Sequence, residues 1–185
     1  MPNTIWWILL ILCLFFATYA AFVIKNEKVE ALSTGKILEF HGFSFTIPRW
    51  WTMTQDEDNL LKFERTDTRY DWRAYFHWVP NPPGDLQDTF EKMAVNRQLV
   101  FDEDTSIIQA PSSLVDIHEQ GVEALRIEGT ATEAQEHRVY YDAFIIQGEG
   151  GHLYLESRSS ILNGLLEGPF FEQTISKVQK IKKAH

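Results

Sequence analysis

The first two dozen residues constrain this chain more than any other segment. Residues 5–24 read IWWILLILCLFFATYAAFVI, and no charged side chain occurs before Lys25. At a helical rise of ~1.5 Å per residue, this run covers about 30 Å, the hydrocarbon thickness of a bilayer. It therefore predicts a single transmembrane anchor over residues 1–24, in contact with lipid through residues 5–24.

A cleaved secretory signal is the alternative reading of this segment. Signals carry a basic n-region and a shorter apolar stretch. Here the residues before the apolar run include no basic side chain, and the run itself is long. Thr18-Tyr19-Ala20 offers a passable cleavage context, so cleavage stays the alternative to an uncleaved anchor.

The rest of the chain is long enough for one domain with a substantial core. Residues 25–36 (KNEKVEALSTGK) predict a polar linker, and residues 37–185 predict one soluble domain. The formal net charge of −9 lies entirely outside the apolar run, and an acidic domain is a poor ligand for nucleic acid. The only cysteine, Cys13, falls inside that run, which excludes an intrachain disulfide and a cysteine-based metal site in the domain.

Alternation of apolar and polar residues predicts strands through most of the domain. The alternation is clearest at 43–47 and 72–79. Further strands are expected at 37–40, 60–66, 114–118, 123–130, 137–147 and 152–157. Helices are predicted over 86–101, after the capping residue Asp85, and from Gly168-Pro169 onward. This order predicts an α+β fold in which helices flank an antiparallel sheet.

Several phrases of the sequence resemble the PsbP-like superfamily of α/β/α sandwiches, which includes DcrB-like bacterial envelope proteins. The resemblance covers residues 37–183 and starts with GFSFTIPRW at 42–50. It continues with YYDAF at 140–144, the 150–155 strand and the helix that contains FFE at 170–172. The resemblance implies a non-catalytic domain that binds other proteins as an extrinsic subunit, adaptor or chaperone.

Arg49, Trp50 and Trp51 are the candidate protein-contact residues. Pro48 ends a strand, and two adjacent tryptophans in a turn cannot easily both be buried. Tryptophan and arginine are enriched at binding hot spots, so an exposed Trp beside Arg49 suits a protein contact. The alternative is that both tryptophans cap the end of the sheet.

Arg73, Tyr75 and His77 share one face of the 72–79 strand and form a weaker candidate for an anion site. The alternative is a polar outer face of the sheet. The six histidines form no metal-binding pattern, and the acidic runs at 56–58 and 102–104 read as solvated loops. We therefore expect no catalytic residues, no metal and no cofactor.

These observations predict a single-pass membrane protein whose domain binds a membrane-protein partner as an accessory or assembly subunit. One alternative is an envelope domain that binds a small ligand or lipid in the cleft between helix and sheet. Another is an enzyme centred on the residues of the anion site. The lysines after the span, Lys25, Lys28 and Lys36, favour a cytoplasmic domain. The resemblance favours the extracytoplasmic side, which is our expectation.

Overall fold

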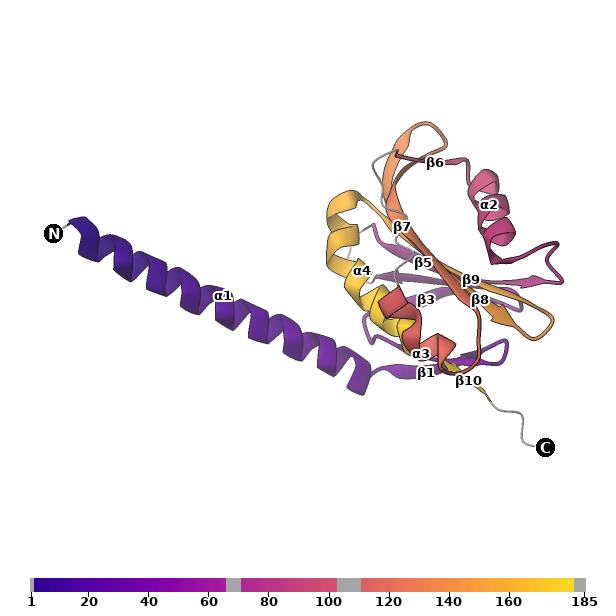
Figure 1. Cartoon of the computed structure of the whole chain (residues 1–185), viewed down its shortest axis with the longest axis horizontal. Coiled ribbons are helices and arrows are strands. Elements are labelled where there is room, and N and C mark those ends of the chain that lie inside the picture. The colour runs from indigo at the N-terminus through magenta and orange to yellow at the C-terminus, as the bar shows by residue number, and fades with distance from the viewer. Residues whose placement is uncertain (1, 66–70, 103–110, 182–185) are drawn as a thin grey trace.

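One long helix, α1 (Pro2–Ser33), leads into an α+β domain in the computed structural model (Figure 1). The structure describes residues 2–65, 71–102 and 111–181. Parts of three predicted segments, residues 66, 103–104 and 182–185, lie outside the described residues. The segment expected to be a linker is mostly helical, because its Glu, Lys, Ala and Leu residues favour helix. Only Thr34 and Gly35 separate α1 from the first strand.

The domain is built around two antiparallel sheets. A seven-stranded sheet has the order β3-β4-β5-β9-β8-β7-β6, and a three-stranded sheet has the order β1-β2-β10. The strands are β1 (Lys36–Phe40), β2 (Phe43–Ile47), β3 (Trp51–Glu57), β4 (Leu60–Arg65), β5 (Arg73–Pro80), β6 (Leu99–Phe101), β7 (Ala124–Glu133), β8 (His137–Gly148), β9 (Gly151–Ser159) and β10 (Gln179–Lys180). The helices of the domain are α2 (Leu86–Asn96), a short 3-10 helix (Pro111–Leu114), α3 (Val115–His118) and α4 (Ile161–Ser176).

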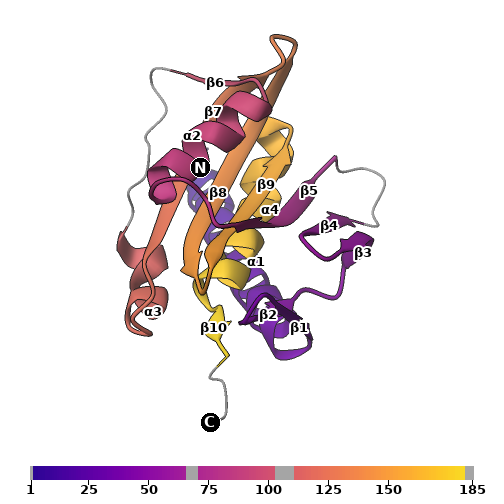
Figure 2. The ribbon, with the colours of Figure 1, turned by 90° about the vertical axis from the view of Figure 1, so that its right-hand side faces the viewer.

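Helices α2 and α4 cover opposite faces of the larger sheet, as Figure 2 shows for β8 and β9. Side chains alternate along β8, so neighbouring residues enter different cores. Under α2, Phe90 and Ala94 pack with Ile127, Tyr141, Ala143, Ile145 and Tyr154. Under α4, Phe171 and Ile175 pack with Phe144, Ile146, Leu153 and Leu155, together with the buried face of β2. The predicted α+β class with a sheet between helices is confirmed.

Two predicted helix boundaries and one predicted strand were wrong. The helix expected over 86–101 ends at Asn96, because Gln98 takes a left-handed conformation and the next residues pair with β7 as β6. The strand expected at 114–118 is helical. The last helix begins at Ile161, seven residues before Gly168, and Pro169 lies inside it.

Helix α4 contains two glycines, Gly164 and Gly168, which disfavour helix. Close packing at Gly164 offsets this low propensity. A Cβ at this position would lie 2.4 Å from Cδ1 of the Tyr140 ring, so only glycine lets α4 approach β8 this closely. Packing against the sheet therefore outweighs the poor local propensity. The same helix offers Gly168 for comparison, where a Cβ would lie an ordinary 3.5 Å from that ring.

The substitution Gly164→Ala is expected to lower the free energy of unfolding by about 1–3 kcal/mol, because the new methyl group displaces Tyr140 or α4. The matched variant Gly168→Ala should be neutral or stabilising by up to about 1 kcal/mol, the gain in helix propensity. Urea denaturation of the full chain in detergent, followed by tryptophan fluorescence, measures both. Equal effects of the two variants would contradict the close approach at Gly164.

Candidate functional site

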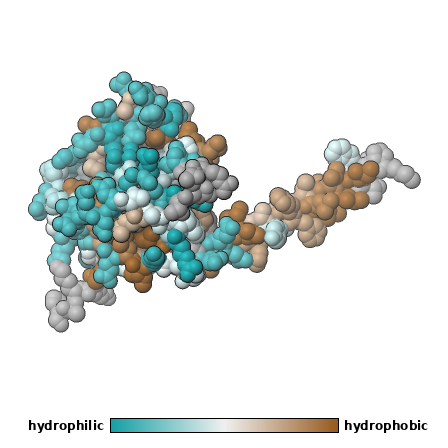
Figure 3. Space-filling view, turned by 180° about the vertical axis from the view of Figure 1, so that it is seen from behind, coloured by the Kyte–Doolittle hydropathy of each residue, from teal (hydrophilic) through white to brown (hydrophobic). Residues whose placement is uncertain are grey.

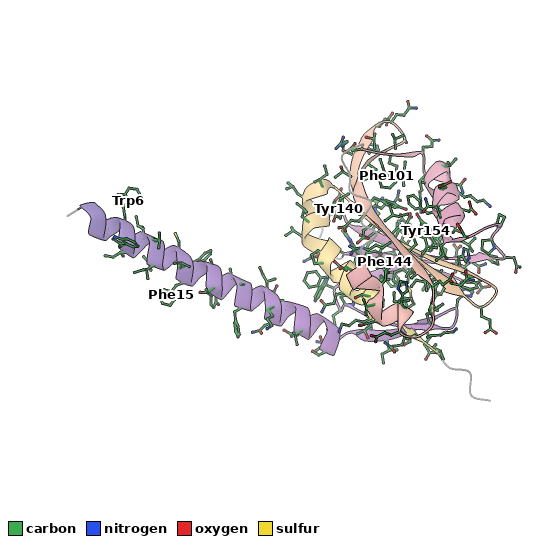
Figure 4. All side chains as sticks on the ribbon, viewed as in Figure 1. Trp6, Phe15, Phe101, Tyr140, Phe144 and Tyr154 are labelled. Carbon is green, nitrogen blue, oxygen red and sulfur yellow. The ribbon has the colours of Figure 1, made fainter. Side chains whose placement is uncertain are left out.

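Helix α1 extends away from the domain. Its stretch from Ile5 to Glu27 is long and apolar enough to cross a membrane, and none of its apolar window is buried in the protein. Figure 3 shows α1 as a mostly hydrophobic rod that becomes hydrophilic where it joins the mostly hydrophilic domain. Trp6 and Phe15 point outward from it (Figure 4). The structure thus contains one N-terminal helix with the features of a membrane anchor or a signal sequence.

The end of α1 meets the domain at a surface that we call the junction. Arg49 is exposed, and its Nε donates a hydrogen bond to the carbonyl oxygen of Thr34, 3.0 Å away. Glu27 and Glu30 of α1 line a recess of about 480 Å³ together with Arg49, Trp50 and Phe170. The junction therefore combines residues from the last turns of α1 with residues of the domain.

The two adjacent tryptophans occupy different environments. Trp50 is half-buried at the junction, where its ring packs edge-on against Phe170 at 5.2 Å between centroids. Its Nε1 donates to Oε2 of the buried Glu167 at 3.4 Å, and Glu167 forms an ion pair with Arg65. Trp51 is buried, with its ring 4.5 Å from that of Trp72. Of the three candidate contact residues, Arg49 and Trp50 remain accessible to a partner and Trp51 belongs to the core.

The candidate anion site divides in the structure. Arg73 is exposed and lies 3.8 Å from the carboxylate of Glu64. Tyr75 and His77 face a cluster under α2 whose anion is supplied by the chain itself, the fully buried carboxylate of Glu156. An external anion would have to compete with this internal one.

Three side chains converge on the carboxylate of Glu156. Arg97 and Tyr141 both donate hydrogen bonds to it, and Nε2 of His77 lies 3.6 Å from Oε1. The Tyr141 hydroxyl also shares a hydrogen bond with Tyr154. Burial alone would raise the pKa of Glu156, but His77, Arg97 and Tyr141 together lower it. Glu156 is thus held as a carboxylate inside the core.

A second charged cluster lies on the opposite face of β8, under α4. Arg126 binds both oxygens of Asp142 at 3.0 Å, and it also pairs with Glu128 at 2.9 Å and with Glu172 at 3.0 Å. Its guanidinium lies 5.0 Å from the centre of the Phe144 ring. One cation therefore faces three carboxylates in a largely buried place.

This surplus of carboxylates affects the ionisation of Asp142. Burial raises its pKa to about 7, with Glu128 and Glu172 adding to the rise and Arg126 opposing it. Burial and Glu172 also raise the pKa of Glu128, against the opposing effect of Arg126. Because Asp142 is completely buried, its proton exchange concerns stability rather than contact with a substrate.

The pH dependence of stability follows from Asp142. Its folded pKa lies above the unfolded value of 3.8, so between about 4 and 7 the folded chain binds more protons than the unfolded chain. The stabilisation that the folded chain gains from proton binding at Asp142 is therefore present at low pH and is lost as the pH rises through 7.

The variant Asp142→Asn lacks this titration but keeps an oxygen for Arg126. Between pH 5 and 8, the stability of the variant relative to wild type should rise by about 1–3 kcal/mol. Urea denaturation at several pH values measures it. Parallel curves for the two proteins would show that Asp142 titrates normally.

The structure also places the other candidate residues from the sequence. Within the described ranges, no three His, Cys, Asp or Glu side chains gather closely enough to hold a metal ion. Of the acidic runs, 56–58 lies at the hairpin between β3 and β4, and Asp102 pairs with Arg138. Between the middle of α2 and the sheet, the side chains of Phe90, Tyr141 and Tyr154 fill the space. A recess of about 640 Å³ opens only at the start of α2, where Leu86 lies near Ala124 and Leu125 of β7.

Comparison of the sequence with models of known families and with curated proteins gives no match. Comparison of the structure with solved structures gives matches. The chain resembles the solution structure of cyanobacterial PsbP (CyanoP) from Synechocystis, with a TM-score of 0.51 at 12% identity, over 76% of this chain and 87% of that one.

Two other solved structures align more loosely. A Bacteroides thetaiotaomicron protein has a TM-score of 0.47 at 12% identity, over 82% of this chain and 50% of that one. A Pseudomonas aeruginosa protein of unknown function, PA94, has a TM-score of 0.43 at 10% identity, over 77% and 94%.

The domain has the PsbP-like fold. The resemblance found in the sequence is thereby confirmed at the level of fold. The PsbP-like sheet is also what brings together the residues that sequence reasoning missed, above all Glu156 and Asp142. Each is a single acid within an apolar strand, and that isolation was the available signal. Their partners Arg97 and Arg126 come from other elements, so only the folded sheet identifies the pairs.

Proposed function

We propose that this protein is a membrane-anchored, non-catalytic accessory domain that binds an integral membrane protein at the junction. Residues 1–24 serve as an uncleaved single-pass anchor, residues 25–33 extend the helix beyond the lipid, and residues 37–185 form the binding domain. The PsbP-like fold and the apolar helix are compatible with such a role. The bound partner forms part of a membrane assembly.

The observation that carries the proposal is the recess shared by α1 and the domain. Its lining includes Glu27 from α1, Arg49 and Trp50 from the β2–β3 turn, and Phe170 from α4. A partner that fills it contacts an aromatic pair and an arginine, residue types enriched in binding energy at interfaces. Because α1 enters the same recess, the partner must lie next to the membrane. The anchor also raises the local concentration of the domain at the bilayer.

Photo-crosslinking from position 49 tests the proposal. A photoreactive amino acid replaces Arg49 in the full-length protein, in its native membranes, and the matched control replaces Glu91, an exposed residue of α2. We expect a discrete adduct with an integral membrane protein from position 49, absent from position 91. Identical adducts from both positions, or adducts with lipid alone, would contradict the proposal.

We also propose that the domain faces the extracytoplasmic side. A single cysteine at Asn26 in a Cys13→Ser background, probed in intact cells with a membrane-impermeant thiol reagent, measures the orientation. Labelling is expected without lysis. Labelling that requires lysis places the domain in the cytoplasm, as the flanking lysines favour.

A further inference from the structure

Three leucines stand exposed in a row on α4. Leu162, Leu165 and Leu166 are 75%, 62% and 54% exposed. Their spacing of three and four residues places them on one side of the helix, opposite the buried Gly164, Glu167, Phe171 and Ile175. A contiguous apolar patch on a domain surface generally marks an interaction site. We call these residues the leucine face.

Helix α4 contributes no charged side chain to the leucine face, and the charged Glu27, Glu30 and Arg49 border it only at the recess that Leu166 lines. From Ile161 to Phe171 the only charged residue is Glu167, which is fully buried and paired with Arg65. The face continues into Phe170 and Trp50, whose rings pack edge-on at the junction, with the indole N–H of Trp50 bonded to Glu167. Tryptophan is the residue that favours the boundary between lipid and water. The composition therefore suits a surface with an apolar interior and a polar boundary.

The position of the leucine face also favours contact with the bilayer. The segment long enough to span ends at Glu27 and α1 ends at Ser33, which is about 9 Å farther along the axis. That distance is similar to one headgroup layer of a bilayer. Leu166 lines the same recess as Glu27, so α4 lies beside this part of α1. Figure 1 shows α4 on the side of the domain toward which α1 extends.

We propose that the leucine face lies in the interfacial layer of the bilayer that α1 spans, as a second lipid contact of the domain. This inference rests on the proposed anchor but requires no protein partner. An interfacial helix buries its apolar side at the boundary of headgroups and acyl chains. Because the domain is acidic and the face uncharged, the contact depends on apolar burial and not on anionic lipid. Two contacts fix the orientation of the domain, with α2 directed away from the membrane.

Depth-dependent quenching in a purified system tests the contact. Full-length protein with Cys13→Ser and Leu165→Cys is labelled with an environment-sensitive fluorophore and reconstituted in phosphatidylcholine vesicles. A fraction of the lipids carries a nitroxide near the headgroup. The matched control is Val95→Cys, 74% exposed on α2 across the sheet from α4. Wild-type protein labelled at Cys13 reports whether the anchor is inserted, read with a nitroxide deep in the acyl chain.

The label at position 165 should be quenched at least about twofold more than the label at 95, with a blue-shifted emission. A label at Leu162→Cys should be quenched like the label at 165. This second position controls for an effect of the label that is specific to position 165. Quenching at Cys13 but at neither leucine position overturns the lipid contact and leaves the anchor intact. Absence of quenching at Cys13 overturns the anchor and, with it, this inference.

A second copy of the chain is the competing occupant of the leucine face. Oxidation of the Leu165→Cys protein at several copies per vesicle should yield little disulfide-linked dimer. Efficient dimer formation together with unquenched fluorescence at 165 overturns the lipid contact in favour of self-association.

Discussion

Replacing Arg126 with methionine is expected to lower the free energy of unfolding by about 3–5 kcal/mol at pH 8. Arg126 is the cation at the centre of the cluster under α4, and it is only 4% exposed. Its removal leaves the completely buried Asp142 facing Glu128 and Glu172 without a compensating charge. The loss should be smaller at pH 5, because a protonated Asp142 needs no counter-charge.

Arg138→Met is the matched control for this prediction. Arg138 also pairs with a carboxylate, that of Asp102 at 2.6 Å, but its side chain is 56% exposed. Exposed ion pairs contribute between zero and about 1 kcal/mol, so this variant should change little. Urea denaturation of both variants at pH 5 and 8 makes the comparison. Similar losses for Arg126 and Arg138 would show that burial does not set the value of the pair at 126.

Replacing Glu156 with alanine is the second large effect, with an expected loss of about 3–4 kcal/mol. Glu156 accepts hydrogen bonds from Arg97 and Tyr141 and is fully buried. With alanine, the buried Tyr141 hydroxyl keeps its hydrogen bond to Tyr154 but loses the one to Glu156. Arg97 and His77 lose the carboxylate that balances their charge. Because Arg97 is partly exposed, water compensates some of its loss, which limits the effect.

Two variants separate the charge of Glu156 from its size and position. Glu156→Gln keeps an acceptor for Tyr141 and should cost less, about 1–3 kcal/mol. Glu64→Ala removes an acid of the same kind from a partly exposed pair on β4, and should cost at most about 1 kcal/mol. Thermal unfolding of the three variants ranks them. If Glu156→Gln is as damaging as Glu156→Ala, the charge and not the hydrogen-bonding geometry dominates.

The stabilisation by the Glu156 cluster under α2 should depend on pH in the opposite sense to the stabilisation by Asp142. Hydrogen bonds and positive charge lower the pKa of Glu156 in the folded state. Its contribution is therefore present above the ordinary pKa of a glutamate and is lost as the pH falls through the lowered value. The two clusters on the two faces of β8 thus favour different pH ranges, and the intact chain reflects their sum.

Strands with strong alternation were predicted well, because period-two patterns report directly which side of a strand is buried. β2 shows it: Phe43, Phe45 and Ile47 are buried, and the residues between them are not. The helices were predicted less well. α4 contains two glycines and a proline that locally disfavour helix, and it is held by close packing of Gly164 against Tyr140 of β8. No local pattern in the sequence encodes that contact.

For the candidate site too, local sequence identified the residues but not their environments. Adjacent Trp50 and Trp51 look alike in the sequence, yet one lies at the junction and the other in the core. Their separation depends on where β3 starts and on Phe170 and Trp72, which come from distant segments. Arg73 and His77 share a strand face as expected, but they bind different carboxylates, because Glu64 and Glu156 lie on neighbouring strands.

The sequence by itself determined that the chain has one apolar helix of membrane-spanning length followed by an acidic α+β domain. These properties depend on local composition and period, which a single sequence records. Only the tertiary structure decided that the uncharged leucine face of α4 lies beside the end of that helix, next to Arg49 and Trp50. Such a surface is assembled from residues more than a hundred positions apart, and it exists only once the sheet has brought them together.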